Sequence, residues 1–105
     1  MTQPGIRHLT PREAYDLVAR AGATLVDVRE PAETKMLRAA GAVLLPLSGF
    51  RPEALPNGEL IFICGSGKRS QMALDRCGAA GLDHRAHVAG GMAAWAAAGL
   101  PVVRG

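Results

Sequence analysis

The sequence contains few of the residues that cross-linked, nucleic-acid-binding or membrane-spanning proteins need. Two cysteines among 105 residues cannot form a disulfide framework, and the first residues do not read as a secretion signal. Aromatic residues make up 4% of the chain and the basic residues are scattered, which argues against a nucleic-acid partner. No apolar run reaches the roughly 18 residues of a membrane-spanning helix. We therefore expect a cytoplasmic protein.

The composition is otherwise that of an ordinary folded domain. Hydrophobic residues account for 49% of the chain and charged residues for 20%, and the net charge is +3. The length predicts one domain over residues 1–105. Because aromatic residues are scarce, its core should consist mainly of aliphatic side chains.

Strand-like and helix-like segments alternate along the chain. Buried strands are predicted at 24–28, 42–45, 60–63 and 85–88, and helices at 11–21, 31–38, 69–80 and 90–98. The first helix has the clearest start, with Thr10 as N-cap and Glu13 three residues later. The alternation predicts an α/β fold, a small and mainly parallel sheet with helices on both faces. In such sheets ligands bind beyond the carboxyl ends of the strands, and Cys64 follows the most apolar strand.

The strongest chemical signal is the segment Cys64-Gly65-Ser66-Gly67-Lys68-Arg69-Ser70. Its two glycines let successive backbone N–H groups turn inward, and the helix that follows adds free N–H groups and its positive dipole end. Together they predict an anion cradle centred on Cys64. These donors, with the cations of Lys68 and Arg69, should lower the pKa of the thiol, which makes Cys64 the candidate nucleophile.

Two other loop chemistries fit this segment less well. A Walker A loop needs glycine at position 62 and serine or threonine at 69, where this sequence has Phe62 and Arg69. Cysteine-dependent phosphatases place an arginine after five intervening residues, whereas four separate Cys64 from Arg69. The shorter ring of amides suits a sulfur atom carried on Cys64 better than a tetrahedral phosphate. A phosphatase is kept as the less favoured alternative.

Four segments resemble, in the right order, the signatures of the rhodanese (thiosulfate sulfurtransferase) homology domain. They are the loop itself, LVDVREPAE at 25–33, GAVLLPL at 41–47 and GGMAAWAAAGLPV at 90–102. The resemblance covers essentially the whole chain and implies a rhodanese-like fold. The family's usual Gly-His-Ile-Pro segment is replaced here by Leu37-Arg38-Ala39-Ala40, so the turn at that point should differ. The loop is also similar to rhodanese domains attached ahead of membrane helices. Membrane association is therefore expected only if the chain is a fragment of a longer anchored protein.

The resemblance implies a sulfurtransferase that works without a cofactor. The Cys64 thiolate would take the outer sulfur of a small sulfane donor such as thiosulfate, become a persulfide and pass the sulfur to a thiol or cyanide. The alternative is a persulfide carrier or regulatory module that acts on a protein partner. Substrate binding is assigned to the rest of the loop, namely Gly65, Ser66, Gly67, Lys68, Arg69 and Ser70. We expect Arg69 to bind the donor's anionic oxygens rather than brace the loop.

The remaining reactive side chains are expected to have structural roles. Asp27 and Arg29 should orient the loops beside the site, and Cys77 should be a small apolar core residue. His84 and His87 flank a strand without cysteine or carboxylate at metal-ligand spacing, so no metal is expected. His8 should lie on the surface of a strand at the start of the chain.

Overall fold

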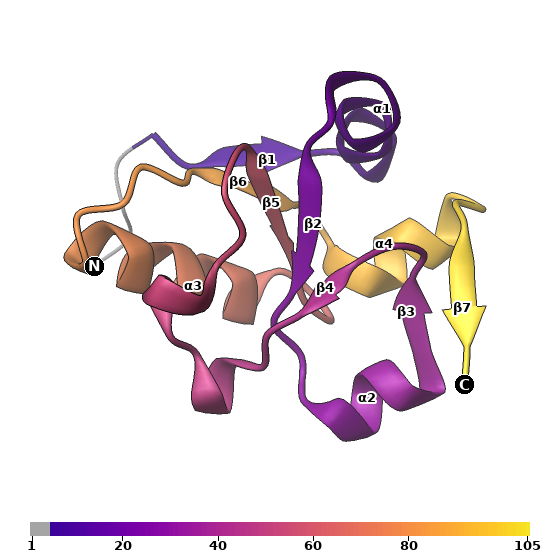
Figure 1. The fold of residues 1–105 in the computed structure, drawn as a ribbon. Helices are drawn as coiled ribbons and strands as arrows, with labels where there is room; N and C mark the ends of the chain where they lie inside the picture. Colours follow the sequence, from indigo (N-terminus) through magenta and orange to yellow (C-terminus); the bar gives the residue numbers. More distant parts are fainter. Residues whose placement is uncertain (1–4) are drawn as a thin grey trace.

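The protein is built around a parallel sheet of five strands in the order β1, β6, β5, β2, β4 (Figure 1). The computed structural model describes residues 5–105. The strands are β1 (Arg7–Leu9), β2 (Thr24–Asp27), β4 (Val43–Leu44), β5 (Leu60–Ile63) and β6 (Ala86–Val88). Every neighbouring pair in this sheet runs parallel. The predicted α/β architecture with a mainly parallel sheet is thus confirmed.

Successive side chains of a β-strand point to opposite faces of the sheet, and those of the central strand β5 belong to two separate hydrophobic clusters. Ile61 and Ile63 belong to the cluster beneath α1 (Pro11–Ala21) and α4 (Gly91–Ala97). Leu60 and Phe62 belong to the cluster beneath α3 (Lys68–Ala79) and the 3-10 turns η1 (Leu47–Gly49) and η2 (Pro52–Ala54). Helices therefore cover both faces of the sheet, as predicted.

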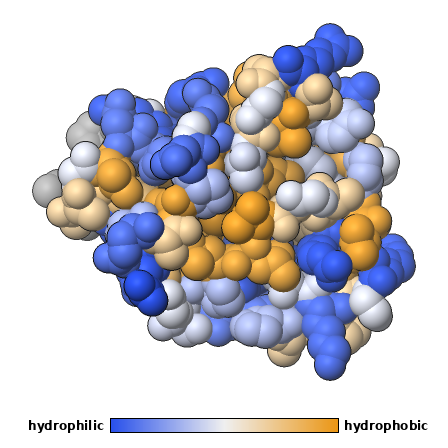
Figure 2. Space-filling view, viewed as in Figure 1, coloured by the Kyte–Doolittle hydropathy of each residue, from blue (hydrophilic) through white to orange (hydrophobic). Residues whose placement is uncertain are grey.

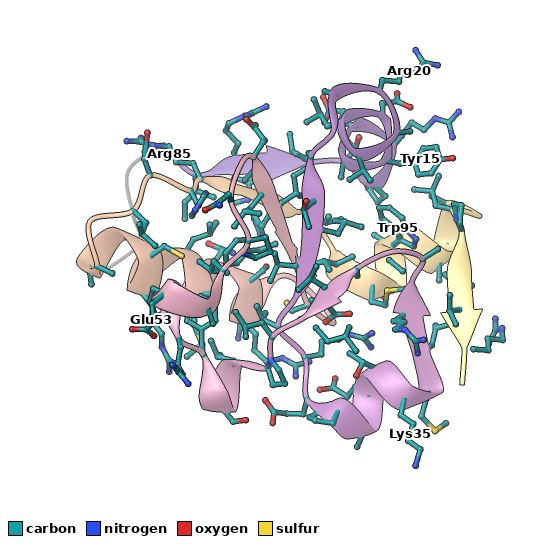
Figure 3. All side chains as sticks on the ribbon, viewed as in Figure 1. Tyr15, Arg20, Lys35, Glu53, Arg85 and Trp95 are labelled. Carbon is teal, nitrogen blue, oxygen red and sulfur yellow. The ribbon has the colours of Figure 1, made fainter. Side chains whose placement is uncertain are left out.

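The cluster beneath α1 and α4 contains the largest buried side chain, that of Trp95. Its ring lies 6.1 Å from the ring of Tyr15 in an edge-to-face arrangement, where α1 and α4 face each other (Figure 3). Its indole N–H donates to the Pro101 carbonyl at 2.9 Å, so the buried polar atom is satisfied. Trp95 therefore belongs to the core between the two helices.

The helix boundaries follow local signals closely where those signals are strong. Thr10 and Glu13 form the predicted capping box of α1, and Gly22 ends the helix with φ 73°. α3 begins at Lys68, one residue before the predicted start, because Gly67 with φ 111° serves as its N-cap. No helix in the part of the chain that the structure describes is both long and apolar enough to cross a bilayer.

The prediction of a helix over residues 31–38 is wrong in its last two residues. α2 (Pro31–Met36) stops after six residues, and β3 (Leu37–Ala39) follows at once. β3 pairs antiparallel with β7 (Val102–Arg104) to form a second, two-stranded sheet. β7 lies more than sixty residues after β3 in the sequence, and no local pattern around 37–39 predicts the pairing. β3 lies within Leu37-Arg38-Ala39-Ala40, the segment in which the sequence departs from the Gly-His-Ile-Pro pattern.

The strand predicted at 42–45 is shorter and less buried than expected. β4 is two residues long and pairs only with β2 at the edge of the sheet. Val43 is 39% exposed and Leu44 is 44% exposed. Figure 2 shows an apolar area in the middle of this face, at the place where Figure 1 draws β4. The apolar run thus marks an edge strand and not a buried one.

Candidate active site

Cys64 comes directly after β5, the central strand of the sheet, and faces the cluster beneath α3. The loop of residues 64–67 then leads into α3, so the N-terminus of that helix lies beside the sulfur. Cys64 has no exposed surface. Although it is the first residue of the loop, Cys64 is therefore part of the packed core.

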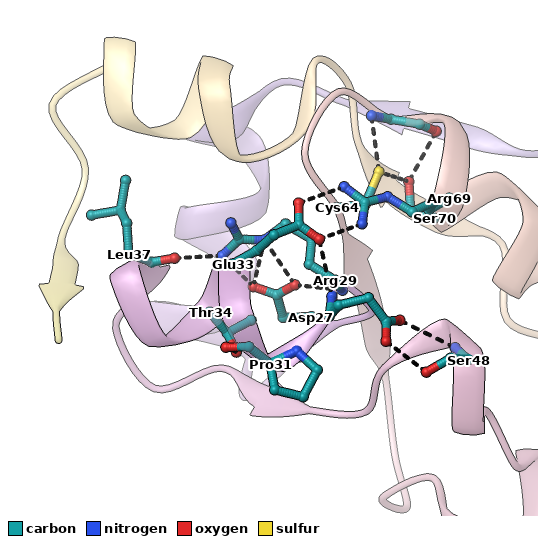
Figure 4. A network of polar contacts seen from close by, with 12 residues as sticks. Asp27, Arg29, Pro31, Glu33, Thr34, Leu37, Ser48, Cys64, Arg69 and Ser70 are labelled. Carbon is teal, nitrogen blue, oxygen red and sulfur yellow. Dashed lines mark hydrogen bonds and ion pairs between the residues drawn. The ribbon is translucent and has the colours of Figure 1, made fainter.

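Polar groups from the loop and from α3 surround the sulfur. The Gly67 N–H donates to Cys64 Sγ at 3.0 Å, and Ser70 Oγ lies 3.6 Å from the same sulfur (Figure 4). Burial raises the pKa of the Cys64 thiol, but hydrogen bonds from the Ser70 N–H and hydroxyl and from the N–H groups of Gly67 and Ser66 outweigh it. The net effect lowers the pKa, the direction that the glycine spacing predicts.

The start of α4 fixes the other side of the loop. The Met92 N–H donates to the Cys64 carbonyl at 2.6 Å, and the Ala93 N–H donates to the Gly65 carbonyl at 3.2 Å. Gly91, with φ 60°, makes this approach feasible, since a Cβ there would lie 2.3 Å from the Cys64 carbonyl oxygen. The Gly90-Gly91 pair therefore allows the N-terminus of α4 to approach the loop closely and donate hydrogen bonds to its carbonyls.

Arg69 makes a bidentate ion pair with Glu33 of α2. Its Nη1 and Nη2 lie 2.5 Å and 2.8 Å from the two carboxylate oxygens (Figure 4). The side chains of Arg69 and Glu33 are 33% and 38% exposed. The guanidinium thus ties α3 to α2 beside the loop, whereas Lys68 next to it is exposed. Sequence reasoning gave Glu33 no role, although it lies inside the 25–33 signature.

Asp27 and Arg29 form a buried ion pair at the end of β2. The Asp27 carboxylate accepts from Arg29 Nε at 3.1 Å and from Arg29 Nη2 at 3.0 Å, and it also accepts from the Arg29 backbone N–H at 3.0 Å. Arg29 Nη2 donates further to the Leu37 carbonyl at 2.6 Å. The pair holds the chain between β2 and β3 in place below the loop, which is the kind of contact the expected supporting role requires.

Two of the three histidines, none of which was given a function from the sequence, are joined to the site through Ser70. Ser70 Oγ lies 2.8 Å from His87 Nδ1, and His87 Nε2 lies 2.7 Å from His8 Nδ1. No local motif predicts this connection, because it depends on the order of the strands. Within residues 5–105 no group of three or more histidine, cysteine or acidic side chains is arranged to hold a metal ion.

Cys77 lies in α3 on the side that packs against the sheet. It is fully buried within the same apolar cluster as Cys64. Burial raises the pKa of the Cys77 thiol to about 11. Such a thiol is almost entirely protonated at neutral pH and is a weak nucleophile, which fits the core role expected of it.

The Glu33–Arg69 pair predicts a defined acid sensitivity. The hydrogen bonds from Arg69 lower the pKa of Glu33 from 4.5 to about 2. Because the folded pKa is depressed, the ionised carboxylate stabilises the folded chain above pH 4.5, and this contribution is lost as the pH falls toward 2. Glu33→Gln should lower stability at neutral pH by about 0.5–1 kcal/mol, since the pair is partly screened by solvent.

Urea unfolding of the wild type, Glu33→Gln and Glu53→Gln as a function of pH measures this effect. Glu53 is a matched control because it is an exposed acidic residue paired with Arg51 at the surface. Glu33→Gln should flatten the acid slope of stability, and Glu53→Gln should leave it nearly unchanged. An equal slope in all three proteins would contradict the assignment.

Comparison with known proteins agrees with this geometry. The rhodanese-like domain family model matches residues 10–98, and the chain belongs to that family. Uncharacterized protein slr1261 of Synechocystis sp. is 37% identical over 99 residues, which cover 91% of this chain and 55% of that protein. The "Probable adenylyltransferase/sulfurtransferase MoeZ" of Mycobacterium tuberculosis is 36% identical over 94 residues, which cover 84% of this chain and 24% of that protein.

The same relationship is visible in three dimensions. The crystal structure of a rhodanese-related protein from Thermoplasma volcanium superposes with a TM-score of 0.81 at 29% identity, covering 92% of this chain and 97% of that one. The chain spans about half and about a quarter of the lengths of the two curated relatives. The fold and family are those the sequence signatures predict, and a sulfurtransferase is named among the relatives.

Proposed function

We propose that the protein is a sulfurtransferase in which Cys64 carries sulfur as a persulfide. The observation that carries the proposal is the hydrogen-bonded sulfur at the carboxyl end of β5, with the Gly67 N–H donating to it at 3.0 Å. Backbone donors aimed at one sulfur stabilise the thiolate and then the negative terminal sulfur of a persulfide. The lowered pKa of the Cys64 thiol and the family membership support the same reading.

The reaction has two displacement steps. The Cys64 thiolate attacks the outer sulfur of thiosulfate, a sulfur–sulfur bond forms to Cys64, and the bond to the sulfonate breaks so that sulfite leaves with the electron pair. In the second step a thiolate or cyanide attacks the terminal sulfur, and Cys64 leaves as the thiolate it was at the start. Both steps are balanced without a cofactor, an oxidant or a reductant.

Access to the sulfur requires the loop to move. Cys64 has no exposed surface, while Ser66 and Lys68 in front of it are exposed. Gly65 and Gly67 give this segment the backbone freedom to open toward a donor. Lys68 is placed to attract an anionic donor, whereas Arg69 already has a carboxylate partner in Glu33. We therefore assign Lys68 the donor-attracting charge and Arg69 a bracing role toward α2.

A persulfide carrier that exchanges sulfur with a protein partner is the second candidate. The buried position of Cys64 favours it, because a partner that docks on the loop could open it. The relative whose name joins an adenylyltransferase to a sulfurtransferase is about four times as long as the matched region, so this unit can work within a larger protein. The phosphatase alternative is less favoured, since Arg69 is already paired with Glu33 and follows Cys64 after four residues rather than five.

Steady-state kinetics with thiosulfate and cyanide test the proposal. A sulfurtransferase should give thiocyanate with the parallel double-reciprocal lines of a ping-pong mechanism. Rapid sulfur uptake from a persulfidated donor protein with slow thiosulfate turnover would favour the carrier. Hydrolysis of an aryl phosphate without any sulfur transfer would contradict both.

A further inference from the structure

A chain of polar side chains leads from the Cys64 sulfur to the surface of β1. Ser70 Oγ lies 3.6 Å from Cys64 Sγ and 2.8 Å from His87 Nδ1, and His87 Nε2 lies 2.7 Å from His8 Nδ1. Ser70 has no exposed surface and His87 is 1% exposed, whereas His8 is exposed to solvent. A buried imidazole with both nitrogens hydrogen-bonded is a polar group with a fixed orientation.

Three elements distant in sequence bring these residues together. His8 and His87 are register partners in the parallel pair β1–β6, and His87 is the register partner of Phe62 in β5. Phe62 faces the cluster beneath α3, and the first turn of α3 supplies Ser70. The His87 ring also lies against the loop, since a Cβ on Gly67 would be 3.7 Å from its Cε1.

The number of protons available decides which group donates in each hydrogen bond between Cys64, Ser70, His87 and His8. Ser70 has one hydroxyl proton and three acceptors within reach, namely Cys64 Sγ, His87 Nδ1 and, at 3.0 Å, the Gly67 carbonyl. If His87 Nδ1 lacks a proton, it takes the Ser70 proton and leaves the sulfur without it. If His87 Nδ1 carries its proton, it donates to Ser70 instead. The hydroxyl proton is then divided only between the sulfur and the Gly67 carbonyl, which also accepts from Gln71 Nε2 at 3.3 Å.

The tautomer of His87 depends in turn on His8. When His87 carries its proton on Nδ1, its Nε2 must accept a hydrogen bond, and His8 Nδ1 is the group that faces it. A protonated His8 always has a proton on Nδ1 and therefore always donates to His87. In neutral His8, Nδ1 can either donate to His87 Nε2 or accept from it, depending on the tautomer. Burial, with a contribution from His8, lowers the pKa of His87, which keeps this ring neutral so that it can donate at one nitrogen and accept at the other.

We propose that His8 and His87 are positioning residues that turn the Ser70 hydroxyl toward the Cys64 sulfur, so that a hydrogen bond donated by His8 Nδ1 to His87 favours the thiolate. The inference rests on the proposed function, in which that thiolate is the attacking group.

Two arginines near His8 and His87 form ion pairs with other residues. Arg7 next to His8 pairs with Glu59 at 3.6 Å, and Arg85 before β6 pairs with Asp83 at 2.6 Å. The further titratable groups on the elements packed against the pair are Cys64 after β5, His84 before β6, and those of α3: Lys68, Arg69, Asp75, Arg76 and Cys77. His84 lies beside Phe62 with ring centroids 6.3 Å apart and is a matched control histidine.

The rate of Cys64 alkylation by iodoacetamide as a function of pH tests the proposal. His8→Phe keeps a ring beside His87 but removes the donor, and its exposed position should allow the variant to fold. Losing one oriented hydrogen bond to the thiolate should slow alkylation about threefold to tenfold in the acid arm of the profile. The rate should rejoin the wild type at alkaline pH, where Cys64 is fully ionised. His8→Asn, whose amide can donate from the Nδ1 position, should restore the acid arm in part, and His84→Phe should not change it.

A double-mutant cycle separates a hydrogen-bonded chain from independent structural effects. Ser70→Ala should slow the acid arm by a similar factor, and His8→Phe should cause no further loss in the Ser70→Ala background. Additive losses, or an unchanged acid arm in His8→Phe, would overturn the proposal. Alkylation needs no sulfur donor, so coupling between His8 and Ser70 in a protein that fails to transfer sulfur would support this inference and contradict the proposed function alone.

Discussion

Cys64→Ser should reduce sulfur transfer from thiosulfate by at least about a thousandfold, because the hydroxyl that replaces the thiol neither ionises at neutral pH nor forms a persulfide. The fold should survive the change. A serine oxygen can accept the same Gly67 N–H and lies within the same ring of donors. Far-ultraviolet circular dichroism and thiocyanate formation, measured on the same preparation, report the two properties separately.

Cys77→Ser is the matched control for this change. Cys77 is as buried as Cys64, but its thiol has a pKa raised to about 11 by burial. The substitution places a hydroxyl in an apolar cluster and should cost about 1–3 kcal/mol of stability. It should leave sulfur transfer near the wild-type rate. Substantial turnover by Cys64→Ser, or a large loss of turnover in folded Cys77→Ser, would contradict the assignment of Cys64 as the nucleophile.

Asp27→Ala should be among the most destabilising single substitutions in the chain. Asp27 has no exposed surface and Arg29 is 6% exposed, so removing the carboxylate leaves a buried guanidinium without its counter-charge. Breaking a buried ion pair on one side costs about 3–5 kcal/mol. The Leu37 carbonyl still accepts from Arg29 at 2.6 Å, but one carbonyl does not neutralise the charge.

Urea unfolding at neutral pH measures the effect of Asp27→Ala, with Glu53→Ala as the control. Glu53 is also an acidic partner of an arginine, but the side chains of that pair are 72% and 69% exposed, and its loss should change stability by less than about 1 kcal/mol. Equal effects of the two substitutions would show that the Asp27–Arg29 pair is not a structural support of the site.

The parts of the fold with strong local signals could be predicted from the sequence. Thr10, Glu13 and Gly22 mark the ends of α1 through contacts within the helix itself. The apolar run at 60–63 becomes the central strand β5, and the glycines after Cys64 turn N–H groups toward the sulfur. Each of these features depends on residues a few positions apart, so it can be predicted from the local sequence.

The features that were missed depend on contacts between distant segments. β3 forms because β7 arrives beside it from the end of the chain, and this pairing overrides the helical pattern that runs to Arg38. Glu33 was given no role, but the fold places it in α2 against Arg69 of α3. His8 and His87 meet only because β1 and β6 are neighbours in exact register. The order of the strands in the sheet cannot be predicted from the spacing of residues in the sequence.

Mass spectrometry of the protein after brief treatment with thiosulfate tests the persulfide most directly. The peptide that contains Cys64 should gain the mass of one sulfur atom, and cyanide should remove that mass. The peptide that contains Cys77 should remain unmodified. An unmodified Cys64 peptide after treatment with both thiosulfate and a persulfidated donor, or a sulfur carried on Cys77 instead, would contradict sulfur transfer through Cys64.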